Sequence, residues 1–254
     1  MLREYIADLH IHSCLSPCAS LDLSPRAIVE RARKQGLDII AITDHNSAKN
    51  VEVIMHLGEQ KGVKVIPGME VQSREEIHLL TFFAEWPPAA AWAEEVYEHL
   101  PDVQNNPDYF GDQPVLDEEG NILEFENRLL LNSISLSLNE IRDRVANYGG
   151  LVVASHYDKD SFSLISQLGL IPEGSRLDAL ELSRRGGRRP PPGILTAPPI
   201  PQILSSDAHG LDDIGSACTV FLLAEPNLDE MRLAFRGEAG RRIVKRIDRQ
   251  ATLL

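Results

Sequence analysis

Cysteine is scarce in this sequence. Only three of the 254 residues are cysteines, Cys14, Cys18 and Cys218, and they form neither an even set nor a Cys-x-x-Cys pair. Reduced thiols are therefore expected rather than disulfides, as in a cytoplasmic protein. The N-terminal stretch also lacks a basic leader and a small-residue cleavage site, so we predict a cytoplasmic location.

Long apolar runs are absent as well. No uninterrupted apolar segment approaches membrane-spanning length, and 43% hydrophobic with 25% charged residues is typical of a soluble globular protein. A chain of 254 residues suits one folding unit, either a barrel-type domain or a domain with an inserted lobe. We expect no membrane association, and no motif indicates an obligate protein partner.

Basic residues are missing from residues 94–126, which hold eleven acids and no Lys or Arg. Since these acids account for −11 of the formal net charge of −13, the rest of the chain carries only −2. The acidity is local, so it does not exclude a phosphate-bearing or nucleic-acid substrate. Three catalytic motifs are also missing: the phosphate-binding Gly-rich loop, the Gly-x-Ser-x-Gly elbow and the His-Glu-x-x-His helix.

Strand and helix patterns alternate in the first third of the chain. Strand-like runs at residues 5–10, 38–43 and 63–66 are separated by amphipathic runs that end near Gly36 and Gly62. Ser24 followed by Pro25 is a helix start signal, and a glycine after the last turn is a stop signal. This order predicts an α/β protein.

The alternation breaks after a strand-like run at residues 77–83. Residues 85–132 are rich in Pro, Asn, Asp and Glu, and we predict an inserted lobe or lid there, with the barrel domain at 1–84 and 133–254. Ser137 and Glu140 fit a capping box. Further strands are predicted at 151–155, 177–182, 202–205 and 217–222, with a helix at 227–235 and a proline-rich loop at 188–201.

Metal-binding residue types follow five of the predicted strands. They lie in the segments Asp8-Leu9-His10-Ile11-His12, Thr43-Asp44-His45, Gly68-Met69-Glu70, Ser155-His156 and Ser205-Ser206-Asp207-Ala208-His209. Because the carboxyl ends of parallel strands meet at one face of an α/β barrel, such residues can converge. Alternate residues of a strand face the same side, so His10 and His12 can reach one metal together. The arrangement predicts one polynuclear site.

Six of the eight histidines lie at or beside predicted strands, namely His10, His12, His45, His78, His156 and His209. Random placement would rarely give this distribution. The other two, His56 and His99, lie in predicted helices or next to acids, and we interpret them as ordinary structural residues.

The order of these motifs resembles the PHP superfamily, named for polymerase and histidinol phosphatase. The resemblance runs from Asp8 to His209, nearly the whole chain, and the combined order is specific although each motif alone is weak. It implies a distorted (β/α)7 barrel whose centre of two or three divalent metal ions hydrolyses phosphate esters. Imidazole and carboxylate ligands accept Mn²⁺, Fe²⁺ and Zn²⁺ alike.

The resemblance also implies roles for single residues. His10 and His12, together with Asp207, look like ligands of the first metal, and Glu70 looks like the carboxylate that bridges two metals. The second metal takes His78 and His156, and a third position takes His45 and His209. For catalysis itself we single out Glu70, His45, Asp207 and His209.

One position departs from the family pattern. The family usually has Asp or His five or six residues beyond the second histidine of the first motif, where this chain has Pro17 and Cys18. Cys18 is either a thiolate ligand of the third metal or a small packing residue beside an empty or water-completed position. Asp44 either orients His45 or caps the helix that follows, and Asp8 has the same ambiguity.

The mechanism implied by such a centre uses water. Two divalent ions roughly 3.5–4 Å apart lower the pKa of a shared water and clamp the phosphoryl oxygens. Arg184, Arg185, Arg188 and Arg189 follow a strand at the metal face, and we predict that Arg184, Arg185 and Lys159 bind substrate phosphate. The predicted substrate is a small phosphorylated molecule, such as a nucleoside 3′,5′-bisphosphate or the 5′ end of a short oligonucleotide.

Two other classes share parts of the pattern. Metal-dependent amidohydrolases also have His-x-His on the first strand, but their bridging group is usually a modified lysine, where this chain offers Glu70. A non-catalytic module that binds metals or phosphates is the other alternative, and the nearly complete set of ligands argues against it.

Overall fold

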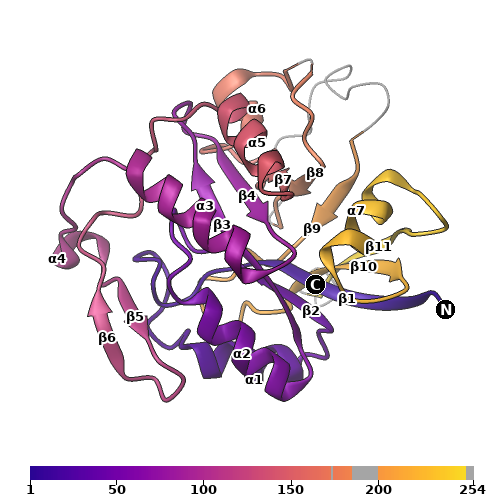
Figure 1. The fold of residues 1–254 in the computed structure, drawn as a ribbon, viewed down its shortest axis with the longest axis horizontal. Coiled ribbons are helices and arrows are strands. Elements are labelled where there is room, and N and C mark those ends of the chain that lie inside the picture. Colours follow the sequence, from indigo (N-terminus) through magenta and orange to yellow (C-terminus); the bar gives the residue numbers. More distant parts are fainter. Residues whose placement is uncertain (173, 185–199, 250–254) are drawn as a thin grey trace.

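A nine-stranded sheet forms the centre of the computed structural model, which describes residues 1–172, 174–184 and 200–249 (Figure 1). The strands follow one another across the sheet in the order β11-β10-β1-β2-β3-β4-β7-β8-β9. Their bounds are β1 (Arg3–Ile11), β2 (Ile39–Ile42), β3 (Lys64–Gln72), β4 (His78–Phe82), β7 (Leu151–Ala154), β8 (Ala179–Leu182), β9 (Gln202–Leu204), β10 (Ala217–Leu223) and β11 (Arg242–Asp248).

The sheet curls until its two edges almost meet. β1, β2 and β3 are parallel, as are β7, β8 and β9, whereas β4 runs antiparallel to both of its neighbours. A parallel bridge from Ile11 to Ala208 connects the end of β1 to the chain after β9. Leu204 and Thr219 exchange two hydrogen bonds of 2.8 Å between β9 and β10. The predicted distorted α/β barrel is therefore confirmed, with β10 and β11 as an antiparallel extension beside β1.

Helices cover the outside of the barrel, as Figure 1 shows for α2, α3 and α5. The bounds are α1 (Pro25–Lys34), α2 (Val51–Lys61), α3 (Trp86–His99), α4 (Pro107–Phe110), α5 (Leu138–Asn147), α6 (Leu164–Leu168) and α7 (Leu228–Arg236). The predicted capping signals are present: Ser24 caps α1, and Ser137 with Glu140 forms the capping box of α5. No described helix combines the length and apolar character needed to cross a bilayer.

Side chains of the strands alternate between two hydrophobic clusters. In β2, Ile39 and Ala41 belong to one cluster, and Ile40 and Ile42 belong to the other, which also contains the buried faces of α1, α2, α3 and α5. This is the alternation expected of a strand buried on both sides. The short strand β2 therefore contributes side chains to both hydrophobic clusters. Its polar residues follow at its carboxyl end.

Residues 85–132 contain two kinds of structure. The sequence did not predict α3, whose Trp92 is fully buried in the core and donates a hydrogen bond from Nε1 to Thr81 Oγ1 at 3.2 Å. Beyond it, α4 and a hairpin of β5 (Pro114–Leu116) and β6 (Ile122–Phe125) project from the barrel at the lower left of Figure 1. The division of the chain at residues 85 and 132 stays a prediction.

Other elements also differ from the sequence expectations. α6 and β11 were not predicted, because α6 spans little more than one turn and β11 is largely exposed and lacks regular alternation. β3 extends to Gln72, so Glu70 lies within the strand rather than after it. Residues 185–199, which hold most of the predicted proline-rich loop, lie outside the described residues.

Candidate metal centre

Polar residues from all seven strands between β1 and β9 meet at one end of the barrel. His10 and Glu181 lie in β1 and β8, Glu70 lies in β3, and His78 is the first residue of β4. Because β4 runs antiparallel, its first residue is at the end where the parallel strands finish. The remaining side chains follow β1, β2, β7 and β9, and they are His12, His45, His156, Asp207 and His209.

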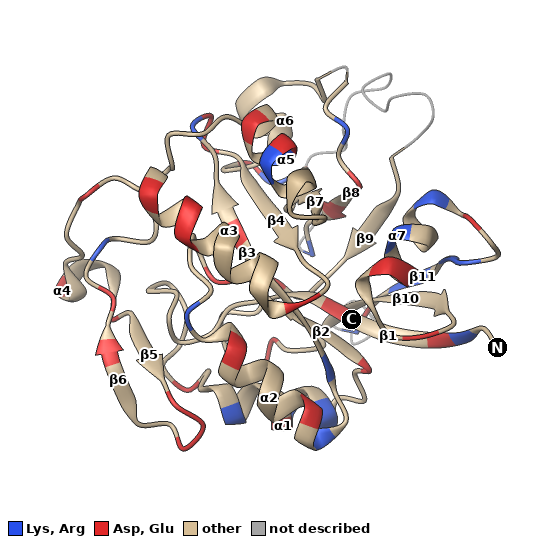
Figure 2. Cartoon of the chain, viewed as in Figure 1, with Lys and Arg blue, Asp and Glu red and all other residues tan. Residues whose placement is uncertain are grey.

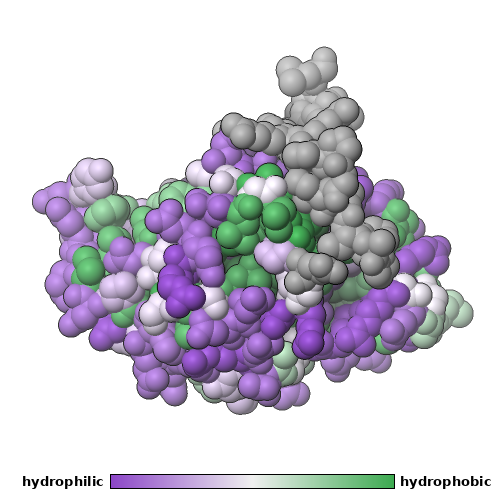
Figure 3. Space-filling model, turned by 90° about the horizontal axis from the view of Figure 1, so that it is seen from above, coloured by the Kyte–Doolittle hydropathy of each residue, from purple (hydrophilic) through white to green (hydrophobic). Residues whose placement is uncertain are grey.

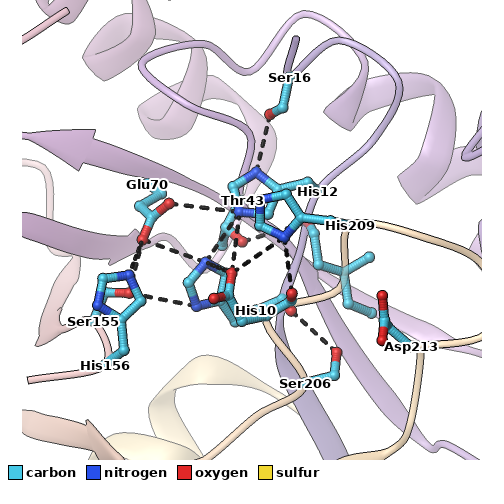
Figure 4. Close-up of polar contacts among 12 residues, drawn as sticks. His10, His12, Ser16, Thr43, Glu70, Ser155, His156, Ser206, His209 and Asp213 are labelled. Carbon is cyan, nitrogen blue, oxygen red and sulfur yellow. Dashed lines mark hydrogen bonds and ion pairs between the residues drawn. The ribbon is translucent and has the colours of Figure 1, made fainter. Parts of the chain in front are cut away.

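Glu70 faces five of these imidazoles, and Figure 4 shows its carboxylate beside His156. Its Oε1 is 3.1 Å from His78 Nδ1 and 3.4 Å from the Nε2 atoms of His10 and His156. Its Oε2 is 3.3 Å from His45 Nδ1 and 3.5 Å from His12 Nε2. Five imidazoles therefore face the two oxygens of one carboxylate that is almost fully buried.

The imidazole rings form a closed circuit around this carboxylate. Successive ring centroids are 4.7–6.1 Å apart in the order His10, His12, His45, His78, His156 and back to His10. His209 joins the circuit beside His12, at 4.4 Å. All six histidines that the sequence singled out thus meet in space. His56 and His99 lie elsewhere, on α2 and at the end of α3.

Several ring nitrogens in the centre have no hydrogen-bond partner. The Nδ1 atoms of His45, His78 and His156 are buried and unpaired, although those of His45 and His78 are within 3.3 Å of Glu70. Buried unpaired nitrogen atoms are costly, and a cation between nitrogen and carboxylate would satisfy both. Among the described residues, three groups of donors could hold an ion, because their ligand atoms lie within 4.8 Å of one another: His10, His12 and Glu70; His45, Glu70 and His78; and His12, His45 and His209.

A second layer of residues fixes the orientation of the imidazoles. His10 Nδ1 is 2.9 Å from Glu181, which directs Nε2 of the same ring toward the centre. His12 Nδ1 is 2.9 Å from Ser16 Oγ, and Ser16 in turn donates to Asp44 at 2.7 Å. Sequence reasoning missed Glu181; a glutamate within an otherwise apolar strand was the available signal.

Asp44 and Asp8 have structural roles that the sequence left open. Asp44 accepts hydrogen bonds from Ser13 and Ser16, has no direct bond to the His45 ring and does not cap α2, whose N-cap is Asn50. The capping reading was therefore wrong, and Asp44 reaches His45 only through Ser16, whose hydroxyl accepts the backbone N–H of His45 at 3.1 Å. Asp8 accepts backbone N–H groups of Ser206 and Gly215, which connects β1 to the segment that carries Asp207.

Burial and mutual attraction determine the charges of the centre. Burial alone would raise the pKa of Glu70, but His78 and His10 hold it well below its usual range. The pKa of Asp207 is likewise held well below its usual range, because His10 and His12 outweigh the effect of burial. Burial lowers the pKa of His12 to about 4. Two carboxylates and a neutral imidazole suit divalent cations.

Backbone conformation at the site is strained. Asn46, His156 and Asp207 have φ values of 46°, 26° and 51°, a left-handed region that residues other than glycine rarely adopt. Each of the three is a polar site residue or directly follows one. Such strain persists where surrounding contacts over-determine the geometry, and it is concentrated at functional sites.

A cavity of about 460 Å³ opens beside the centre, lined by His156, Asp207 and His209. Lys159 and Arg184 also line it, so the structure places two of the predicted phosphate-binding residues at the site. Lys159 Nζ is 3.3 Å from Asp207, and Arg184 is held by Asp213 and Ser216.

One predicted metal ligand, Cys18, is not brought into the three donor groups. Cys18 is exposed rather than buried as a packing residue, and it belongs to none of the three donor groups among the described residues. Arg185 lies outside the described residues, as do Arg188 and Arg189.

Known proteins match parts of this chain. The family model described as PHP domain matches residues 8–157. An uncharacterized protein, MJ1587, of Methanocaldococcus jannaschii is 32% identical over 103 residues, which cover 37% of this chain and 60% of the relative. A 5′-3′ exoribonuclease of Haemophilus influenzae is 31% identical over 83 residues, which cover 32% of this chain and 28% of the enzyme. The chain therefore spans less than two thirds of these relatives.

Solved structures show the same fold over nearly the whole chain. The lesion-specific endonuclease Q of Pyrococcus furiosus covers 96% of this chain with a TM-score of 0.71 at 21% identity, and the chain covers 58% of it. Endonuclease Q bound to a duplex with an abasic lesion at its active site covers 98% of this chain with a TM-score of 0.73 at 20% identity, and 61% of that protein is covered.

Proposed function

Since this chain belongs to the PHP domain family, with the family model matching residues 8–157, we propose that it is a metal-dependent phosphoesterase acting on nucleotides or oligonucleotides. The observation that carries the proposal is Glu70 at the centre of five imidazoles, with unpaired buried nitrogens facing it. His10, His12, His45, Glu70, His78, His156, Asp207 and His209 are the proposed ligands. Cys18 stays a candidate for the third position.

The side chains have separate tasks in this proposal. Divalent ions bound there would polarise phosphoryl oxygens and lower the pKa of a water molecule. Glu181 holds the Nδ1 side of His10 and Ser16 holds that of His12, so the opposite nitrogen of each ring points inward. Lys159 and Arg184 supply positive charge at the cavity for phosphate oxygens.

The substrate class is supported from two directions. The site borders a cavity of about 460 Å³, and Lys159 and Arg184 line it beside the proposed ligands. The similar proteins include an exoribonuclease and an endonuclease whose structure holds a duplex substrate with an abasic lesion. Both kinds of enzyme hydrolyse phosphodiester bonds of nucleic acid, and we assign the same bond type to this chain.

The test is hydrolysis by purified protein supplied with Mn²⁺. Single-stranded and duplex oligonucleotides labelled at either end, a nucleoside 3′,5′-bisphosphate and histidinol phosphate serve as substrates. We expect cleavage of the nucleic-acid substrates, and their end labels distinguish cutting from the 5′ end and internal cutting. Faster turnover of histidinol phosphate would overturn the substrate class. Hydrolysis of amides but no phosphoester would overturn the reaction, and full metal occupancy without any turnover would favour a binding module.

A further inference from the structure

Phe162 stands out beside the candidate metal centre. Its φ of 53° lies in the left-handed region, which is a genuine outlier for a bulky residue. Its side chain is 41% exposed, although aromatic rings usually bury their large apolar surface. The fold thus maintains a strained backbone and leaves an apolar ring at the surface, a combination typical of functional positions.

The ring of Phe162 is stacked on a proposed metal ligand. Its centroid is 5.0 Å from that of His78, and the two planes differ by only 16°. The backbone carbonyl of Phe162 also accepts the His78 N–H at 3.0 Å. His78 in turn faces Glu70 through Nδ1 and Gln72 through Nε2. The ring therefore has a fixed position next to the centre.

The loop that carries Phe162 also borders the cavity. Lys159, Asp160 and Ser161 of this loop line the cavity together with His156 and Asp207. Ser163 terminates the loop, because its hydroxyl donates to the carbonyl of Lys159 at 2.6 Å and caps α6. This short loop, which Ser163 fixes by hydrogen bonds, therefore presents the Lys159 ammonium group and the exposed Phe162 ring beside the same site.

Apolar surface gathers on this side of the molecule. The view from above shows a hydrophobic area over the α6 end of the barrel (Figure 3). Phe162, Leu168 and Leu170 in and around α6 are among the exposed large hydrophobic residues. An apolar surface next to Lys159 and the candidate metal centre suits a ligand with a flat apolar part and an anionic part.

From this placement we propose that Phe162 is a stacking platform for a nucleobase of the substrate, with the phosphate backbone lying toward Lys159 and the metal centre. The proposal rests on the nucleotide or oligonucleotide substrate proposed above. A ring already stacked on one side offers a rigid second face, and base stacking on aromatic side chains tolerates any base sequence. Phe162 is thus a positioning residue that selects ligands carrying bases.

The experiment compares two single strands of equal length with phosphorothioate backbones that resist hydrolysis. One is oligothymidylate and the other consists of abasic units, so the backbone charge is the same. Binding to the Mn²⁺-loaded protein is measured by fluorescence anisotropy for the wild type, Phe162→Leu and Phe162→Tyr. Phe125→Leu is the matched control, because Phe125 is also an exposed phenylalanine but lies on β6, away from the candidate ligands.

We expect Phe162→Leu to weaken binding of the base-bearing strand by about 10-fold and to leave binding of the abasic strand unchanged. Phe162→Tyr and Phe125→Leu should keep the preference of the wild type. Equal weakening for both strands, loss of bound metal by mass spectrometry in Phe162→Leu, or no preference in the wild type would overturn the proposal. Since the ligands resist hydrolysis, failure of the catalytic assay is a separate result.

Discussion

At the scale of single residues, the candidate metal centre depends on polar side chains that hold the proposed ligands in position. Glu181 is almost fully buried, holds His10 Nδ1 and accepts the backbone N–H of His156. It therefore connects two proposed ligands that lie on different strands. Removing such a hydrogen-bond partner leaves the ligands present but no longer fixes the orientation of their side chains.

Glu181→Gln should reduce metal affinity or activity by about 10- to 100-fold, because the amide mimics the shape of the carboxylate but not its charge on His10. Metal content by mass spectrometry and oligonucleotide hydrolysis are the measurements. Glu140→Gln, at an exposed carboxylate of α5, is the control. Unchanged metal content and activity in Glu181→Gln would show that His10 needs no such partner.

Asp178 gives a prediction about pH. Burial raises its pKa, although it accepts the backbone N–H of Val152 at 2.8 Å. Because the folded state holds this proton more tightly than the unfolded state, stability falls as pH rises from the usual Asp pKa to the raised value. Asp178→Asn keeps an acceptor without the charge. We expect it to gain stability relative to the wild type above this window, and the gain to vanish below it, in urea unfolding at several pH values.

At the scale of elements, the direction of β4 decides one ligand of the centre. A parallel β4 would carry His78 to the opposite end of the barrel, whereas the antiparallel strand brings it beside Glu70. Helices contribute differently, since they cover the strands and fix where each loop begins. Two of them have contacts that mutation can test: the capping box of α5 and the buried tryptophan of α3.

Ser137→Ala should destabilise the protein by about 1 kcal/mol, because the backbone N–H of Glu140 in the first turn of α5 loses its side-chain acceptor. Chemical unfolding followed by circular dichroism measures the change. Ser137→Thr keeps a hydroxyl at the same position and should retain most of the stability. Equal losses in both variants would mean that the hydroxyl bond is not the cause.

Trp92→Ala should cost roughly 3–5 kcal/mol, since it removes a large buried side chain and its bond to Thr81. Tyr109→Ala lies in the same segment, at a residue that is 79% exposed, and should have little effect. The pair tests whether α3 belongs to the barrel while α4 only extends from it. Similar unfolding midpoints for the two variants would contradict that division.

At the scale of the whole molecule, charge is unevenly distributed. Acidic residues lie along α3 and the β5–β6 hairpin (Figure 2), so the net charge of −13 says little about the cavity. The cavity lining itself has two basic residues against four acids, namely Asp160, Glu181, Asp207 and Asp213. Without bound cations this surface would repel a phosphate, so substrate affinity should depend on metal.

Removal of metal by a chelator should lower the melting temperature and abolish binding of oligonucleotide. Ions that bind only the folded state add about 2.7 kcal/mol when their concentration is 100 times the dissociation constant. Differential scanning calorimetry and anisotropy before and after dialysis measure both effects, and re-addition of Mn²⁺ should reverse them. Oligonucleotide binding that survives complete removal of metal would contradict the charge argument.

Much of the fold and of the centre could be predicted from short-range signals. Ser24 with Pro25, Ser137 with Glu140 and the alternating strands act locally, so the α/β class, the helix starts and the histidines at strand ends were readable in the sequence, while the barrel was implied by the family resemblance. The helix α3 and strand β11 were not, because proline-rich or exposed segments carry weak periodicity. Glu181 was missed since its role depends on His10, which is far away along the chain.

The sequence by itself determined which residue types stand at the strand ends, and hence that cations could be bound there. Only the tertiary structure decided that Glu70 lies between five imidazoles, that Glu181 braces His10 and that Phe162 covers His78. The physical reason is that propensity and periodicity act over a few residues. The direction of β4, the closure of the sheet and the spacing of side chains arise from packing between segments that are far apart along the chain, such as β4 with β7 and Ile11 with Ala208.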